Sequence, residues 1–215
     1  MLTPDHKSPI DRCLLCDQEG RPFKDGVYLE CGECGGIFRP KGDHPSVQEE
    51  KTRYEEHQND VDDPGYQRFV SPITAQIQTD FASDSRGLDF GSGTGPVISK
   101  ILADAGYDIK QYDPIFSNKP DLLESRYDYI VCCEVIEHFH NPAREFNLLK
   151  SLLKPGGKLY CMTLLHHDGI DFANWHYRRD PTHVFIFQKR TLEWVREHTP
   201  FSGLAIEDRL IVFDA

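Results

Sequence analysis

The sequence predicts an α/β protein with a doubly wound, mostly parallel sheet, preceded by a small metal-binding module. Three observations lead to this prediction. From Arg86 onward, short apolar segments alternate with amphipathic ones, which is typical of a sheet with helices on both faces. The first apolar segment runs into a glycine-rich turn at 91–95, and two C-x-x-C pairs lie near the N-terminus.

Length, composition and net charge limit the number of domains and the classes of function that the chain can have. A prior of roughly 150 residues per domain makes the 215 residues one full domain and a small appendage. The chain is 39% hydrophobic and 27% charged, so it can bury a core. Its net charge of −11 argues against a broadly basic surface for nucleic acid or membrane. With no long apolar run and no signal-like start, we expect a cytoplasmic protein.

We expect three zones: a metal-binding module at 1–42, a helical linker at 43–85 and the α/β domain at 86–215. In the linker, 46–59 reads as a helix with Ser46 as its N-cap and too few apolar residues for a core helix. Residues 64–81 have amphipathic helical spacing, and Pro72 predicts a kink or break near Ser71.

The α/β domain divides into elements by its apolar patterns and its turn residues. A Lys-Pro-Gly-Gly turn at 154–157 is expected to stop the helix before it. The predicted strands are 87–90, 107–112, 127–133, 158–163, 204–207 and 210–213, and the predicted helices are 96–105, 142–153 and 190–198.

The four N-terminal cysteines predict a structural zinc site. Fourteen residues separate the pair Cys13 and Cys16 from the pair Cys31 and Cys34. Two such turns facing each other give a tetrahedral set of four thiolates, which suits zinc and leaves no open position for catalysis. Metal binding would also supply the folding energy that so short a segment lacks. The alternatives are a redox C-x-x-C pair or two disulfides.

The glycine-rich turn predicts a ligand site. Gly91, Gly93 and Gly95 follow a strand and precede a helix, so a ligand can approach backbone amides with no Cβ in the way. Asp113 comes about twenty residues later, where doubly wound folds place the acid that binds ribose hydroxyls. The alternative is a tight turn and a solvated aspartate. Proline at position 96 departs from the dinucleotide fingerprint and disfavours a nicotinamide or flavin enzyme.

At this point a family resemblance is plain. Residues 88–95 (LDFGSGTG) resemble the first motif of class I S-adenosylmethionine-dependent methyltransferases, of the type 11, 12 and 23 kind. Residues 127–138 resemble their fourth strand and the loop after it, and 152–159 the turn into their fifth strand. The resemblance implies a Rossmann-like, seven-stranded-type sheet. The cysteine pairs resemble zinc ribbons that precede such domains in some sugar- and RNA-modifying enzymes.

The resemblance also implies a cofactor site for S-adenosylmethionine. Gly91 and Gly93 would lie against its methionine part, Asp113 would hold its ribose, and Asp89 would orient the glycine loop. Tyr66 and Phe69 would cover it, although core packing explains these two equally well. The implied contacts are Tyr66, Phe69, Asp89, Gly91, Ser92, Gly93, Thr94, Gly95, Asp113, Cys133 and Glu134. Residues 115–126 depart from the family, because they are short and rich in Pro and Asn where a third strand is usual.

A Glu-x-x-Glu-His unit suggests a second metal site. Ubiquinone-pathway O-methyltransferases and small-RNA 2′-O-methyltransferases bind a divalent ion with a similar unit. By that resemblance the candidate ligands are Glu134, Glu137, His138 and His183. The alternative is the same unit without metal, with His138 as a general base or a helix-terminus partner.

The segment 166–183 is too long for a simple connector and is rich in aromatic and titratable residues, so we expect it to build a substrate site. The candidate contacts are Trp175, His176, Tyr177, Arg178, Arg179, Asp180 and His183. His138, His176 and His183 are candidate proton acceptors. We expect methyl transfer to oxygen, nitrogen or carbon of a small molecule or sugar. The alternatives are an inactive zinc-dependent binding module and an RNA methyltransferase.

Overall fold

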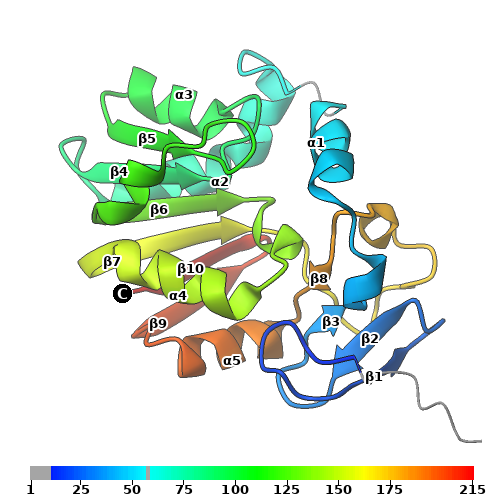
Figure 1. The fold of residues 1–215 in the computed structure, drawn as a ribbon. Coiled ribbons are helices and arrows are strands. Elements are labelled where there is room, and N and C mark those ends of the chain that lie inside the picture. Colours follow the sequence, from blue (N-terminus) through cyan, green and yellow to red (C-terminus); the bar gives the residue numbers. More distant parts are fainter. Residues whose placement is uncertain (1–10, 57–58) are drawn as a thin grey trace, which may run out of the picture.

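The computed structural model describes residues 11–56 and 59–215. These residues form a six-stranded sheet and a smaller four-stranded sheet (Figure 1). The predicted α/β fold with a mostly parallel sheet is confirmed. Within the described residues, no helix is both long and apolar enough to cross a bilayer.

The large sheet has the order β5-β4-β6-β7-β10-β9. Its first four strands run parallel, while β10 is antiparallel to both of its neighbours. The strands are β4 (Arg86–Phe90), β5 (Asp108–Tyr112), β6 (Tyr127–Cys133), β7 (Leu153–Met162), β9 (Gly203–Glu207) and β10 (Leu210–Asp214). β7 begins at Leu153, directly after the preceding helix, so the predicted turn at 154–157 lies inside an early part of this strand.

Helices cover both faces of this sheet because side chains alternate along its central strand. Tyr129 and Val131 of β6 pack with α2 and α3, whereas Ile130 and Cys132 face the side of α4 and α5. The helices are α2 (Pro64–Asp80), α3 (Val97–Asp104), α4 (Pro142–Leu152) and α5 (Lys189–His198).

The edge of the sheet beyond β5 differs from the seven-stranded expectation. Between Asp113 and Tyr127 the chain makes an isolated bridge to Ser117 and a 3-10 helix, η2 (Pro120–Glu124). No strand forms there, so the described residues give six strands in this sheet. The short, Pro- and Asn-rich stretch noted in the sequence is therefore where the family's third strand is missing.

Helix α2 runs through Pro72 without ending there, so of the predicted kink or break near Ser71, the break is wrong. A proline has no N–H to donate to the carbonyl four residues earlier. Here that carbonyl belongs to Arg68, and the Ser71 hydroxyl donates to it at 2.8 Å. The serine thus replaces the hydrogen bond that the proline removes.

The small sheet has the order β1-β2-β3-β8. Its strands are β1 (Gly20–Phe23), β2 (Tyr28–Cys31), β3 (Ile37–Phe38) and β8 (Phe185–Ile186). The fourth strand comes from the far side of the sequence and pairs antiparallel with β3. A 3-10 helix, η1 (Lys41–Asp43), and helix α1 (Val47–Glu55) then lead toward the large sheet. A capping box between Ser46 and Glu49 starts α1, as the N-cap serine predicted.

Candidate active site

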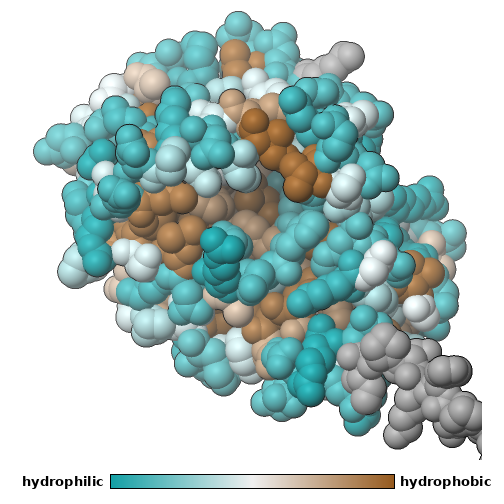
Figure 2. All heavy atoms as spheres, in the orientation of Figure 1, coloured by the Kyte–Doolittle hydropathy of each residue, from teal (hydrophilic) through white to brown (hydrophobic). Residues whose placement is uncertain are grey.

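A cleft of about 1100 Å³ opens at the carboxyl ends of β4, β5 and β6. This is the edge at which open parallel sheets bind ligands. Figure 2 shows a hollow with hydrophobic walls on this face of the molecule. Helix α1 lies opposite the strand ends (Figure 1) and lines the other side of the cleft. The cleft is therefore bounded by the sheet on one side and by a linker helix on the other.

The glycine loop takes a left-handed backbone at Gly91 (φ +82°) and Gly93 (φ +60°). A Cβ on Gly91 would stand 2.6 Å from Val135, so no side chain fits there. A Cβ on Gly93 would meet nothing within 4 Å, so the loop leaves an open cradle toward the cleft. Its amides are not bare, however, because those of Gly91 and Ser92 both donate to Tyr112 O.

Asp113 fastens this loop to the end of β5. One carboxylate oxygen accepts from the amides of Ile115 (2.8 Å) and Phe116 (2.9 Å), and the other from Gly93 (3.0 Å). The residue is 7% exposed and lines the cleft. A carboxylate has about four acceptor positions, so three amide bonds leave one for a ligand hydroxyl.

Most of the predicted cofactor residues meet in this cleft. The cleft is lined by Tyr66, Gly91, Ser92, Gly93, Thr94, Asp113, Cys133 and Glu134. Phe69, Asp89 and Gly95 are not among its lining residues. Phe69 lies under the Arg209 guanidinium, at 4.5 Å. Asp89 is buried and accepts a hydrogen bond from the Ser99 hydroxyl at 2.7 Å.

An apolar wall beside Asp113 was not assigned from the sequence. Phe90 and Tyr112 lie with ring centroids 5.2 Å apart at the carboxyl ends of β4 and β5. Their neighbours come from the segment that lacks the third strand, from the loop after β6 and from α4. The wall consists of Phe90, Tyr112, Ile115, Phe116, Leu123, Phe139 and Leu148. No spacing in the sequence marks these residues as a group, because they come from five separate segments.

Three of the candidate metal ligands meet beside η3 (Ile136–His138). Ligand atoms of Glu137, His138 and His183 lie within 4.8 Å of one another. Glu137 is fully buried. Its Oε1 accepts from the Tyr177 hydroxyl at 2.5 Å, and its Oε2 has no hydrogen-bond partner among the described residues. Such an orphaned buried carboxylate oxygen suits a cation.

The two histidines of this cluster are oriented by backbone carbonyls. His138 Nδ1 lies 2.9 Å from Thr182 O, and His183 Nδ1 lies 2.7 Å from Tyr177 O. An Nδ1–H that donates to a carbonyl leaves Nε2 as the lone-pair nitrogen, which is how metal-binding histidines are usually held. Burial lowers the pKa of His183, so the neutral form that a metal requires is favoured.

Glu134 stands apart from the cluster. Its Oε1 accepts from Arg209 at 2.9 Å, and its backbone is left-handed (φ +51°). Burial, together with the charge of Glu137, raises the pKa of Glu134 to about 8, against the opposing effect of Arg209. Burial also raises the pKa of Glu137. Of the two carboxyl groups, Glu134 lines the cleft, while Glu137 is fully buried and is not among the lining residues.

The candidate substrate residues divide between two surfaces. His176, Tyr177 and Arg179 of η4 (His176–Arg179) line the cleft, as do Asp180 and His183. The other two face the small sheet. Arg178 pairs with Asp25 at 2.7 Å, and the ring of Trp175 packs against Phe172, with centroids 6.2 Å apart.

Helix α1 supplies three cleft residues that the sequence reasoning missed. Glu50 accepts from His140 Nε2 at 2.7 Å, Arg53 pairs with Asp180 at 2.9 Å, and the Tyr54 ring meets His138 edge-on at 5.3 Å. Their spacing of three and four residues places them on one helix face, which is the signal that could have found them. Arg209, in the turn between β9 and β10, carries no such signal.

The four N-terminal cysteines come together as predicted. Cys13 Sγ and Cys34 Sγ lie 3.4 Å apart, Cys16 Sγ and Cys31 Sγ lie 3.3 Å apart, and all four sulfurs fall within 4.8 Å of one another. A zinc ion with Zn–S bonds near 2.3 Å needs sulfurs about 3.8 Å apart, so the set fits with small adjustments. A hydrogen bond from Cys34 lowers the pKa of Cys13 to about 6, which favours a thiolate.

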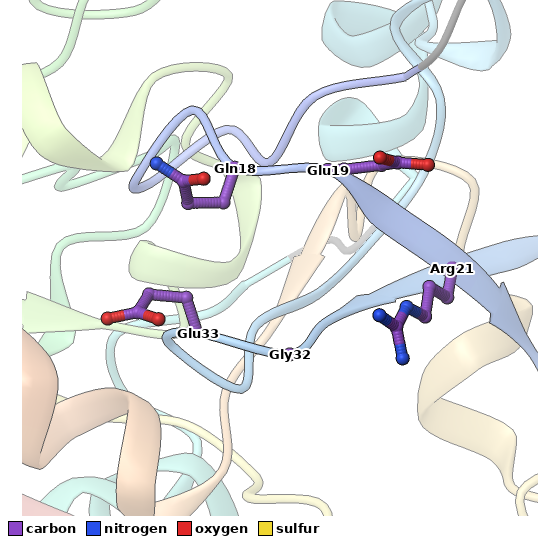
Figure 3. A pocket seen from close by; sticks show the side chains of 5 residues that line it. All are labelled: Gln18, Glu19, Arg21, Gly32 and Glu33. Carbon is purple, nitrogen blue, oxygen red and sulfur yellow. The ribbon is translucent and has the colours of Figure 1, made fainter.

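A second, shallower hollow of about 460 Å³ lies on the small sheet. Figure 3 shows its side chains, with Gln18 and Glu33 on one side of the hollow and Arg21 on the other. All of its lining residues are exposed: Gln18, Glu19, Arg21, Gly32 and Glu33. It contains neither a buried titratable group nor a ligand-like cluster, so the large cleft is the candidate site.

Comparison with known proteins agrees with this geometry. A family model described as a methyltransferase domain matches residues 63–205. Ubiquinone biosynthesis O-methyltransferases are similar to this chain: the one from Cereibacter sphaeroides is 28% identical over 60% of this chain and 64% of its own length. The one from Erwinia tasmaniensis is 28% identical over 36% of this chain and 32% of its own length. The matches therefore span from about a third to just under two thirds of these relatives.

Solved structures share the fold at low sequence identity. The 1,6-didemethyltoxoflavin N1-methyltransferase of Burkholderia thailandensis has a TM-score of 0.58 at 12% identity, covering 86% of this chain and 97% of that one. The magnesium protoporphyrin IX methyltransferase of Synechocystis has a TM-score of 0.53 at 16% identity, covering 80% and 88%. Both were solved with bound S-adenosylhomocysteine.

Proposed function

The chain belongs to the class I S-adenosylmethionine-dependent methyltransferases, and we propose from that premise that it methylates an oxygen atom of a small molecule. The observation that carries the choice of oxygen is the cluster of Glu137, His138 and His183 at the cleft. A bound divalent ion there would hold acceptor oxygens next to the end of β6. The names of the ubiquinone-pathway relatives support the same choice.

The cofactor half of the cleft would be the part near β4 and β5. S-adenosylmethionine supplies a methyl group made electrophilic by its sulfonium. Gly91 and Gly93 would take its methionine part, the free acceptor position of Asp113 its ribose, and the apolar wall its adenine. Cys133 and Glu134 would then lie beside the sulfonium. The open cradle at Gly93 and the position of Asp113 in the cleft support this placement.

The acceptor half would be the part near α1 and η4. Glu137, His138 and His183 would hold the divalent ion, and the orphaned Oε2 of Glu137 supports that role. Of the three candidate proton acceptors, only His176 lies outside this ligand cluster. We therefore assign to His176 the removal of the hydroxyl proton. Alignment of the acceptor oxygen with the methyl group is the larger part of catalysis in such a site.

The four-cysteine centre would hold zinc in a structural role. Its sulfur distances support four-thiolate binding, and such a site has no open coordination position. An inactive binding module and an RNA methyltransferase gain no support from the comparisons.

The test is methyl transfer from labelled S-adenosylmethionine to a panel of a catechol, a hydroxylated sugar nucleotide, a primary amine and a structured RNA. We expect label on the hydroxylated small molecules, dependent on added Mg²⁺ or Mn²⁺ and lost in Glu137→Gln. Label on the amine or on RNA alone would overturn the assignment to small-molecule oxygen.

A further inference from the structure

The segment that carries His183 is built into the small sheet. In sequence it belongs to the α/β half of the chain. In space its strand β8 pairs with β3, through Ile37 with Ile186 and Phe38 with Phe185, as Figure 1 shows. The Arg39 amide also donates to Val184 O at 2.9 Å. The residues just after His183 are therefore held by the zinc module.

Tyr28 of β2 is the central contact between the module and this segment. Its side chain is fully buried, and its hydroxyl lies 3.1 Å from His183 O and 3.2 Å from Arg178 O. Arg39 Nε donates to the same hydroxyl at 3.0 Å, and Arg39 Nη2 donates to Arg178 O at 3.3 Å. Burial raises the pKa of Tyr28, so the hydroxyl remains a donor at neutral pH.

Few bonds separate that hydroxyl from the candidate ion site. Tyr28 fixes the carbonyl of His183, whose own Nδ1 bonds to Tyr177 O at 2.7 Å. The Tyr177 hydroxyl reaches Glu137 Oε1 at 2.5 Å. A shift of the His183 backbone would therefore move both a histidine ligand and the group that orients the carboxylate.

The cysteine centre adjoins the same contact. Cys31 ends the strand that carries Tyr28, and its amide donates a hydrogen bond to Gly36 O at 2.9 Å. Gly36 approaches β8 so closely that a Cβ there would stand 2.2 Å from the Phe185 ring. Loss of the metal would free the turn at residues 31–36 to move, and this turn is part of the surface against which β8 packs.

We propose that the zinc module is a working part of the acceptor site, in which Tyr28 positions the 176–186 segment so that His183 completes the ion-binding cluster. This inference rests on the proposed function, because it assumes the divalent-ion site that the proposed function assigns to Glu137, His138 and His183. Tyr28 is a positioning residue in this account, since it touches neither cofactor nor acceptor. The module is thus more than an appendage that folds beside the enzyme.

The test compares Tyr28→Phe with Tyr107→Phe in the full, zinc-loaded chain. Tyr107 also bonds through its hydroxyl to a backbone carbonyl, that of Phe81 at 2.9 Å, and it lies outside the cleft. Two affinities are measured by calorimetry: S-adenosylhomocysteine, and Mn²⁺ with S-adenosylhomocysteine bound. Loss of an outer partner of a metal ligand typically weakens metal binding about 10–100-fold.

We expect Tyr28→Phe to weaken Mn²⁺ about tenfold while the affinity for S-adenosylhomocysteine stays unchanged, and Tyr107→Phe to change neither. Arg39→Gln is a second variant, expected to show the same split. Unchanged Mn²⁺ binding in both variants, or equal loss of both ligands, would overturn the proposal. So would a wild type that binds S-adenosylhomocysteine but no Mn²⁺. A wild type that binds neither would instead overturn the proposed function itself.

Discussion

At the scale of single residues, Asp113 joins the end of β5 to the glycine loop. The sequence placed it about twenty residues after the glycine turn, and in the structure its carboxylate bonds to the Gly93 amide at 3.0 Å. The same side chain therefore shapes the glycine loop and keeps one acceptor position for a ligand. A charge-assisted hydrogen bond of this kind contributes about 1.5–3 kcal/mol.

We predict that Asp113→Asn weakens binding of S-adenosylhomocysteine by roughly ten- to a hundredfold, which corresponds to that loss. Equilibrium dialysis with labelled ligand measures it. Asp104→Asn is the control, because Asp104 is an exposed partner of Lys100 on α3. An Asp113→Asn variant that binds as tightly as the wild type would remove Asp113 from the site.

Asp89 makes a different prediction, about stability. Burial raises its pKa to about 6, although the Ser99 hydroxyl opposes the shift. A carboxyl group whose folded pKa is raised stabilises the fold below the unfolded pKa, and this contribution is lost as the pH rises through the folded value. At neutral pH the charged form costs up to about 3 kcal/mol.

We therefore expect Asp89→Asn to be more stable than the wild type above pH 6, and to lose that advantage between about pH 6 and pH 4. Urea unfolding of both proteins at pH 4.5 and pH 7.5 measures the difference. Any loss of bound zinc at the lower pH would affect the wild type and the variant alike. The account is contradicted if the free energy of unfolding of the variant, minus that of the wild type, is smaller at pH 7.5 than at pH 4.5.

At the scale of elements, α1 has an unusual role for a polar linker helix. Its sequence has too few apolar residues for a core helix, yet Glu50, Arg53 and Tyr54 reach the cleft from one face. The Glu50–His140 and Arg53–Asp180 contacts anchor it at 2.7 and 2.9 Å. The helix is therefore held by polar contacts and by the capping box at Ser46.

We predict that Ser46→Ala destabilises the chain by about 1 kcal/mol through loss of the cap. Ser151→Ala is the control, because the Ser151 hydroxyl bonds back to Leu148 O near the end of α4 and alanine is the better helix former. Chemical denaturation compares the two. Equal effects of both substitutions would mean that α1 does not depend on its cap.

The elements also show what the sequence could and could not predict. Strand β6 has the predicted bounds at 127–133, because a fully buried strand is a continuous apolar run. The two-residue strand β8 was not predicted, since so short a segment has no periodicity and forms only against β3. The continuity of α2 was missed because Ser71 compensates for Pro72 through a side-chain bond that propensity does not include.

At the scale of the whole molecule, the fold class was predictable, and most of the residues proposed for the cofactor line one cleft, because motif spacing fixes them along one stretch of chain. The proposed acceptor half of the cleft was harder to predict from the sequence. It combines α1, the loop after β6, η4 and the turn before β10, and such long-range assembly leaves no local pattern. Nothing in the sequence indicated that Arg178, a candidate substrate contact, pairs with Asp25 in the turn between β1 and β2.

The shared sheet predicts that zinc stabilises the whole chain. We expect about one zinc per chain by elemental analysis, and a melting temperature lowered by roughly 5 °C or more after removal, since a chain of this size loses about 2–4 °C per kcal/mol. Differential scanning fluorimetry of Cys16→Ser against the wild type measures it. An equal melting temperature would show that the module unfolds on its own or holds no metal.

The central claim is that the cleft at the ends of β4, β5 and β6 binds the methyl donor. A crystal structure of the chain with S-adenosylhomocysteine tests it most directly. We predict the ribose hydroxyls on Asp113, the homocysteine against Gly91 and Gly93, and the sulfur beside Cys133 and Glu134. A ligand bound elsewhere, or a cleft that stays empty at saturating concentration, would contradict the account.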